Sequence, residues 1–162
     1  MNIPNYMTVV DNKLIRGKAV VSPLRLYKMK RENITQIIDL RNSPTARQAI
    51  ERFFCKILGI KYINCKYPHR LSTLPKHEFL EHINDLILKH KDKTYIHCQY
   101  GKRRTGIAVA FYEKLHTNKS KDDIFNNLMN LGFNDVFKVK VSKRLSRYKK
   151  ILKEFCQTYL DN

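Results

Sequence analysis

The chain has 162 residues, of which 43% are hydrophobic and 28% charged, as expected for a folded protein with one core. No segment approaches the roughly 18 consecutive apolar residues of a transmembrane helix, and the N-terminus lacks a signal-peptide pattern. We therefore expect an intracellular, reducing location, the cytoplasm or else the nucleus, which also fits four cysteines without disulfide spacing. The formal net charge of +18 favours polyanionic partners.

Five short apolar or β-branched runs predict strands. In chain order they cover residues 6–10, 13–16, 34–40, 61–65 and 94–97. The first two flank Asp11-Asn12, a pair typical of a tight hairpin at the edge of a sheet.

Helix signals lie between and after these runs. The expected helices run from Pro23 to about Arg31, from Ser43-Pro44 to Gly59, from Pro75 onward, from Ile107 to about His116, from Ser120 to Met129, and from about Ser142 to Leu160. The second of them has an apolar face at Ile50, Phe53, Phe54, Ile57 and Leu58.

Helices that alternate with short buried strands indicate an α/β fold with a central, mainly parallel sheet of about four or five strands flanked by helices. No repeat, low-complexity stretch or linker interrupts the chain, so we expect a single domain over residues 1–162. Ligands of such sheets bind beyond the carboxyl ends of the strands, which is where the segment around residue 98 falls.

The segment from His97 to Gly106, HCQYGKRRTG, carries the clearest chemistry. It connects a strand to a helix, and a loop in that position directs its backbone N–H groups inward as an anion site. Cys98, at the first position of the loop, would place a thiol beneath a bound phosphate, and Arg104 follows six positions later. This arrangement predicts a cysteine-dependent phosphatase.

His97-Cys98, the next five residues and Arg104-Thr105-Gly106 resemble the active-site loop of the protein tyrosine and dual-specificity phosphatase superfamily. The chain length, the strand at Ile37–Arg41 and the Gly-Lys-x-Arg-Thr-Gly form resemble its compact atypical dual-specificity type. The resemblance implies a dual-specificity phosphatase-like fold. It also implies hydrolysis through a phosphocysteine at Cys98, with no metal and no cofactor.

The residues of the loop have distinct expected roles. Cys98 attacks phosphorus as a thiolate, which requires its pKa to fall well below the usual value of about 8.5. The planar fork of Arg104 binds two phosphoryl oxygens, and by the resemblance Thr105 donates to the sulfur while His97 supports the loop. The expected phosphate-binding residues are Gln99, Tyr100, Gly101, Lys102, Arg103 and Arg104.

Other phosphate and metal motifs fit less well. Gly101-Lys102 lacks the following Ser or Thr and the upstream glycine of a nucleotide-binding P-loop. In low-molecular-weight tyrosine phosphatases and related arsenate reductases the cysteine lies near the N-terminus. Cys65 and His69 are four residues apart, but no second pair of zinc ligands follows, so we expect no metal.

The sequence does not identify the residue that donates a proton to the leaving group. Most members of the superfamily carry an aspartate about thirty residues before the cysteine as general acid, whereas residues 66–74 here contain no Asp or Glu. His69 and Asp39 are the two candidates, His69 otherwise being an ordinary loop residue and Asp39 a partner of Arg41 or of loop N–H groups. A third alternative is a phosphoanhydride substrate, whose leaving group departs without an acid.

These features leave several substrates open. We expect phosphotyrosine or phosphoserine/threonine proteins or phosphoinositides, because Lys102 and Arg103 suit substrates with more than one phosphate. One alternative is an RNA 5′-triphosphatase of the same superfamily, since its viral members also lack the aspartate. Another is a non-catalytic phosphate- or RNA-binding module.

A basic run near the C-terminus is a candidate contact for a polyanion or an anionic membrane. The alternative is a solvated helix face. The run consists of Lys138, Lys140, Lys143, Arg144, Arg147, Lys149, Lys150 and Lys153.

Overall fold

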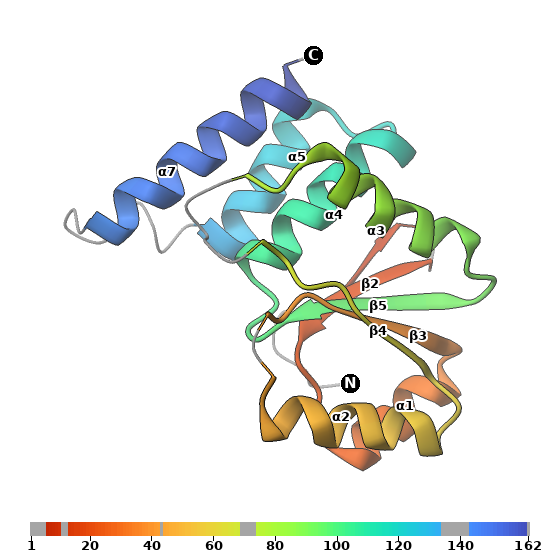
Figure 1. The fold of residues 1–162 in the computed structure, drawn as a ribbon. Coiled ribbons are helices and arrows are strands. Elements are labelled where there is room, and N and C mark those ends of the chain that lie inside the picture. The colour runs from red at the N-terminus through yellow and green to blue at the C-terminus, as the bar shows by residue number, and fades with distance from the viewer. Residues whose placement is uncertain (1–5, 11–12, 43, 69–73, 134–142, 162) are drawn as a thin grey trace.

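The computed structural model describes residues 6–10, 13–42, 44–68, 74–133 and 143–161. Its centre is a five-stranded sheet with the order β1-β2-β5-β3-β4 (Figure 1). Strands β2, β5, β3 and β4 are parallel, and β1 pairs antiparallel with β2 at one edge, so the predicted mainly parallel sheet is confirmed. The strands are β1 (Met7–Val10), β2 (Leu14–Lys18), β3 (Ile34–Asp39), β4 (Lys61–Asn64) and β5 (Lys93–Cys98).

Helices cover both faces of the sheet (Figure 1). One face carries α1 (Pro23–Arg31) and α2 (Ala46–Ile57). The other carries α3 (His77–Lys89), α4 (Arg103–His116), α5 (Lys121–Leu128) and α7 (Lys143–Phe155). The π-helical turns η1 (Met129–Phe133) and η2 (Cys156–Leu160) extend α5 and α7. None of the helices in the described part of the chain has the length and hydropathy to cross a membrane.

The sheet separates two hydrophobic cores because successive side chains of a strand point to opposite faces. Ile38 and Ile96 pack with the helices of the α3–α4 face. Their neighbours Ile37 and Tyr95 pack with α1 and α2. The alternation fixes the register of β3 against β5, in which Ile38 pairs with Ile96.

Helix α2 differs from its sequence prediction in where it starts and in which face it buries. It begins at Ala46 rather than at Ser43-Pro44, because the Thr45 side chain caps it by accepting a hydrogen bond from the Gln48 N–H at 3.1 Å. Its polar face is buried, with Gln48, Glu51 and Cys55 turned inward. Most of the apolar face lies outside: Ile50, Phe53 and Ile57 are 44%, 59% and 62% exposed, and Phe54 and Leu58 are partly buried.

Some sequence predictions lie outside the described residues. These are the Asp11-Asn12 turn, His69, and Lys138 and Lys140 of the basic C-terminal run.

Candidate active site

The Cys98 loop lies at the carboxyl end of the parallel strands. Cys98 is the last residue of β5, and Arg103 is the first residue of α4. The sheet therefore places the predicted anion-binding loop where an α/β fold binds its ligands, with the amino end of α4 directed at it. All the predicted phosphate-binding residues lie in this loop or in the first turn of α4.

The environment of Cys98 favours its thiolate. Burial by itself raises the pKa of this thiol, which is 6% exposed. The Thr105 hydroxyl and the backbone N–H groups of Tyr100, Thr105 and Lys102 surround the sulfur and stabilise its negative charge, and together they hold the pKa of Cys98 below its ordinary value. In the described part of the chain no such donors act on the buried Cys55 and Cys65, and burial raises their pKa to about 12 and about 11.

Two glycines bring the loop against β2. Gly101 has φ +65°, and a Cβ on it would lie 2.2 Å from the Gly17 carbonyl oxygen. A Cβ on Gly17 would in turn lie 2.1 Å from the Tyr95 hydroxyl oxygen. Residue 101 therefore has to be glycine, both for its left-handed backbone and for the contact. The sequence analysis placed Gly101 in the phosphate-binding loop, but nothing in the sequence pointed to its contact with Gly17.

Arg16 is a site residue that the sequence analysis missed. It is buried in β2, and its Nη2 donates to the carbonyl oxygens of Gly101 at 2.8 Å and Lys102 at 3.2 Å. Burial lowers the pKa of Arg16 to about 10, against the raising effect of the Cys98 and Glu113 charges. The side chain therefore stays protonated at neutral pH and holds the loop through its two carbonyl oxygens. Only its position beside Gly17 in a short strand could have indicated this role.

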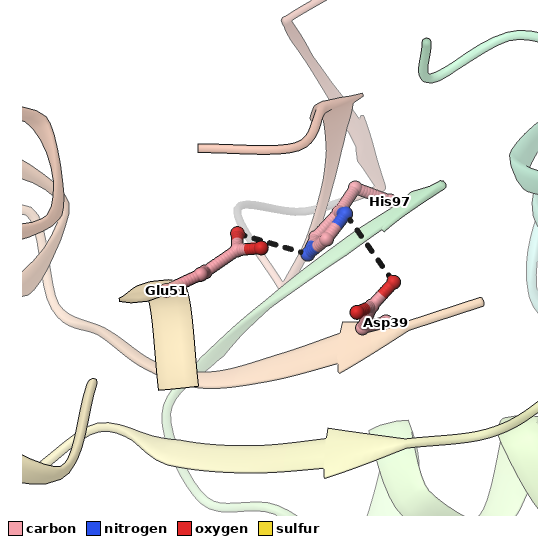
Figure 2. Close-up of side chains that lie close together, drawn as sticks. All are labelled: Asp39, Glu51 and His97. Atoms are coloured by element: carbon pink, nitrogen blue, oxygen red, sulfur yellow. Dashed lines mark ion pairs between the residues drawn. The ribbon is translucent and has the colours of Figure 1, made fainter. Parts of the chain in front are cut away.

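A buried ionic network supports the loop from the other side (Figure 2). The Arg41 guanidinium binds Asp39, with Nη2 2.8 Å from Oδ2, and also contacts the Glu51 carboxylate. His97 lies between the two carboxylates, with Nε2 3.2 Å from Glu51 Oε1 and Nδ1 3.7 Å from Asp39 Oδ1. Burial lowers the pKa of His97, but the charges of Glu51 and Asp39 outweigh it and raise that pKa. This geometry agrees with the predicted supporting role of His97.

The same network determines what Asp39 can do. Its side chain is fully buried and accepts hydrogen bonds from Arg41, from Gln48 Nε2 at 2.8 Å and from the Tyr62 hydroxyl. Burial raises the pKa of this carboxyl, but His97, Arg41 and Tyr62 bring it below its ordinary value. A buried carboxylate without a proton does not fit a general acid. The geometry fits the alternative role of Asp39 as the partner of Arg41.

Asp39, Glu51 and His97 are also the group within the described part of the chain that has the spacing of metal ligands. Their ligand atoms all lie within 4.8 Å of one another. However, the Arg41 guanidinium already bonds both carboxylates, so a divalent ion would have to displace a buried cation. The two carboxylates are therefore already neutralised by Arg41, and the arrangement is an ionic network rather than a metal site.

Tyr67 is a second site residue that the sequence analysis missed. It is 1% exposed, its ring packs edge-on against Phe79 at 5.6 Å, and its hydroxyl has no hydrogen-bond partner among the described residues. Burial and the Cys98 charge raise the pKa of Tyr67 while the Arg104 charge lowers it, with a net rise. The phenol therefore stays protonated within electrostatic range of both residues. A lone tyrosine before a loop carries no sequence signal for this role.

Comparisons with known proteins agree with this fold. No protein-family model matches the sequence, and no curated protein matches it either. Among solved structures, the catalytic core of the PP-IP phosphatase SIW14 from S. cerevisiae is 20% identical, with a TM-score of 0.75 over 100% of this chain and 89% of that one. PTPMT1 in complex with PI(5)P is 17% identical, with a TM-score of 0.59 over 94% and 97%.

A PTP-like phytase from Bdellovibrio bacteriovorus is 14% identical, with a TM-score of 0.65 over 99% of this chain and 85% of that one. At such identities the similarity establishes the fold. The dual-specificity phosphatase-like α/β fold implied by the HCQYGKRRTG motif is thus confirmed.

We predict that Glu51→Gln lowers the free energy of unfolding by about 3–5 kcal/mol, because it removes one of the two buried carboxylates that neutralise Arg41 and His97. The backbone N–H of Val20, which donates to Glu51 Oε1 at 3.0 Å, also loses a charged acceptor. Urea denaturation measures the loss. The control is Glu81→Gln in the exposed His77–Glu81 pair, which we expect to change stability by less than about 1 kcal/mol. Equal effects of the two substitutions would contradict a structural role for the network.

A second prediction compares two glycines that share a left-handed backbone. Gly59 has φ +62°, and the nearest atom to a Cβ there is Lys30 Nζ at 4.0 Å, so Gly59→Ala costs only the backbone strain of about 1–2 kcal/mol. Gly101→Ala adds the clash with Gly17 and displaces the loop. We expect Gly101→Ala to abolish binding of the oxyanion tungstate in calorimetry, and Gly59→Ala to retain it. Retained binding in Gly101→Ala would show that the close contact does not shape the site.

Proposed function

We propose that this protein is a phosphatase that uses the Cys98 thiolate as its nucleophile. The observation that carries this proposal is the position of a buried thiol at the end of a parallel strand and at the N-terminus of a helix, where the Thr105 hydroxyl and three backbone N–H groups lower its pKa. A cysteine kept only for packing would have a raised pKa, as Cys55 and Cys65 do. The phosphatase folds of the similar structures support the same reading.

The proposed reaction has two steps. The Cys98 sulfur attacks phosphorus, an S–P bond forms, and the P–O bond to the leaving group breaks, so that the leaving oxygen departs with the electron pair and takes up a proton. Water then attacks the phosphocysteine, which releases inorganic phosphate and restores the thiolate. Arg104 meets the charge that grows on the phosphoryl oxygens, and the Thr105 hydroxyl stabilises the departing sulfur. The Tyr67 hydroxyl supplies a further neutral donor.

For the substrate we propose a phosphorylated inositol compound, either soluble or a phosphoinositide. Three similar structures support this choice: a PP-IP phosphatase, a protein bound to PI(5)P and a phytase. The consecutive cations Lys102, Arg103 and Arg104 also suit a substrate with several phosphates.

We predict that Cys98→Ser lowers turnover of an aryl phosphate by at least about 10³-fold, and that EDTA leaves the wild-type rate unchanged.

A further prediction concerns the pH profile. Because the reactive form is the thiolate, kcat/KM falls as the pH drops through the pKa of Cys98. Thr105→Ala removes a donor, raises that pKa and moves the acidic limb of the profile to higher pH, whereas Thr105→Ser preserves it. Tungstate binding without turnover in the wild type would instead support a non-catalytic phosphate-binding module.

A substrate panel tests the inositol assignment. We expect phosphate release from inositol phosphates or phosphoinositides to exceed that from phosphopeptides and from triphosphate-ended RNA by at least about tenfold in kcat/KM. Cys98→Ser provides the blank for each substrate. Preference for the RNA end would favour a 5′-triphosphatase, and preference for the phosphopeptide would favour a protein phosphatase.

A further inference from the structure

Helices α1 and α2 expose an apolar surface to solvent. Of the eight large hydrophobic side chains that are exposed among the described residues, five lie on these two helices. These five, which we call the α1–α2 surface, are Leu24 (63% exposed), Tyr27 (48%), Ile50 (44%), Phe53 (59%) and Ile57 (62%). Apolar groups gathered in this way on a folded domain mark an interaction site more often than isolated ones do.

The spacing of these residues places them in two rows. Leu24 and Tyr27 are three positions apart on α1, and Ile50, Phe53 and Ile57 are three and four positions apart on α2, so each row follows one helix face. The buried residues of both helices lie on the opposite faces. Because α1 and α2 contact each other side by side over the same face of the sheet (Figure 1), both rows lie on the outer side of this layer.

The orientation of α2 is fixed from inside the protein. Glu51 must point inward to bind Arg41 and His97, and this turns the opposite, apolar face of the helix to solvent. Phe53 makes an edge contact with Phe54, with ring centroids 5.4 Å apart, but Phe53 and Ile57 are mostly exposed, and polar residues at these positions would satisfy the same buried network. Their apolar character therefore needs an explanation outside the core.

The charge around this surface is positive. Lys28 and Arg31 follow Leu24 by four and seven positions on the same face of α1, and Arg47 and Lys56 lie on α2, all of them exposed. The two helices contain one acid, Glu51, which is buried. The next acid, Glu32, follows α1 and accepts a hydrogen bond from Tyr6.

We propose that the α1–α2 surface docks on an anionic lipid membrane. The aliphatic and aromatic side chains enter the interface, and the surrounding Lys and Arg side chains contact acidic headgroups, each such contact adding to the attraction. A second copy of the chain fits less well, because a symmetric contact would oppose like charges. Since α2 begins shortly after the carboxyl end of β3, the surface reaches the edge of the sheet that carries Cys98.

This location differs from the one that the sequence indicated. The basic C-terminal run was the sequence-based candidate for a membrane contact. On α7 the described side chains begin at residue 149, and the large hydrophobic ones among them, Ile151, Leu152 and Phe155, are all buried beside Lys149, Lys150 and Lys153. Charge without apolar side chains gives attraction but no insertion.

A fluorescence experiment tests the proposal directly, because the chain has no tryptophan. Phe53→Trp places a single probe on the α1–α2 surface. Leu115→Trp, at a residue of α4 that is 52% exposed on the other side of the sheet, is the matched control. With phosphatidylcholine vesicles that contain phosphatidylserine, we expect a blue shift of the emission for Phe53→Trp and none for Leu115→Trp. No shift, or the same shift in both, would overturn the proposal.

Vesicle co-sedimentation supplies the binding strength. We expect Phe53→Ser combined with Ile57→Ser to weaken partitioning onto phosphatidylserine vesicles at least about tenfold, and Leu115→Ser to leave it unchanged. Equal binding by the wild type and both variants would attribute the attraction to net charge alone and refute docking through this surface. The proposal would also be refuted if the protein did not bind vesicles but formed dimers that Phe53→Ser abolishes. Aryl phosphate turnover in solution should not change, so this result stands or falls separately from the proposed function.

Discussion

The buried contact between Arg41 and the two carboxylates of Asp39 and Glu51, with His97 between them, is the interaction on which the rest of the structure depends. It joins the end of β3, helix α2 and the end of β5 at one point. None of the four side chains can be removed alone, because its opposite charge would then be left buried without a partner. His97 is the residue before Cys98, so the network also fixes the backbone from which the Cys98 thiol projects.

This constraint explains the unusual orientation of α2. A helix normally buries its apolar side, since burying a side chain such as Phe or Ile stabilises the fold by about 1.5–3 kcal/mol. Here the need to neutralise Arg41 and His97 outweighs that gain, and Glu51 faces inward. The apolar residues on the other side of α2 then become available for another purpose. The interior of the site and the outer surface of the protein are thus connected through one helix.

The lowered pKa of Cys98 likewise comes from its surroundings. Three elements shape the loop: β5 ends at the cysteine, α4 begins at Arg103, and β2 supplies Arg16 and the close contact at Gly17. Arg16 and Gly101 are 85 positions apart in the chain. Burial opposes the thiolate, and the pKa falls only because the loop geometry directs several donors at one sulfur atom. A small displacement of the loop would leave burial as the dominant effect.

The sequence by itself determined the order and type of the elements, the parallel sheet and the cysteine–arginine loop. These features are encoded locally, in periodicities of two and 3.6 residues and in the chemistry of ten consecutive positions. Only the tertiary structure decided the roles of Arg16, Gly17 and Tyr67, the commitment of Asp39 to Arg41, and which face of α2 is buried. Each of these depends on side chains from distant segments meeting in the interior, where a charge or polar group is stable only beside its partner. The hydrophobic pattern of one helix contains no information about that partner.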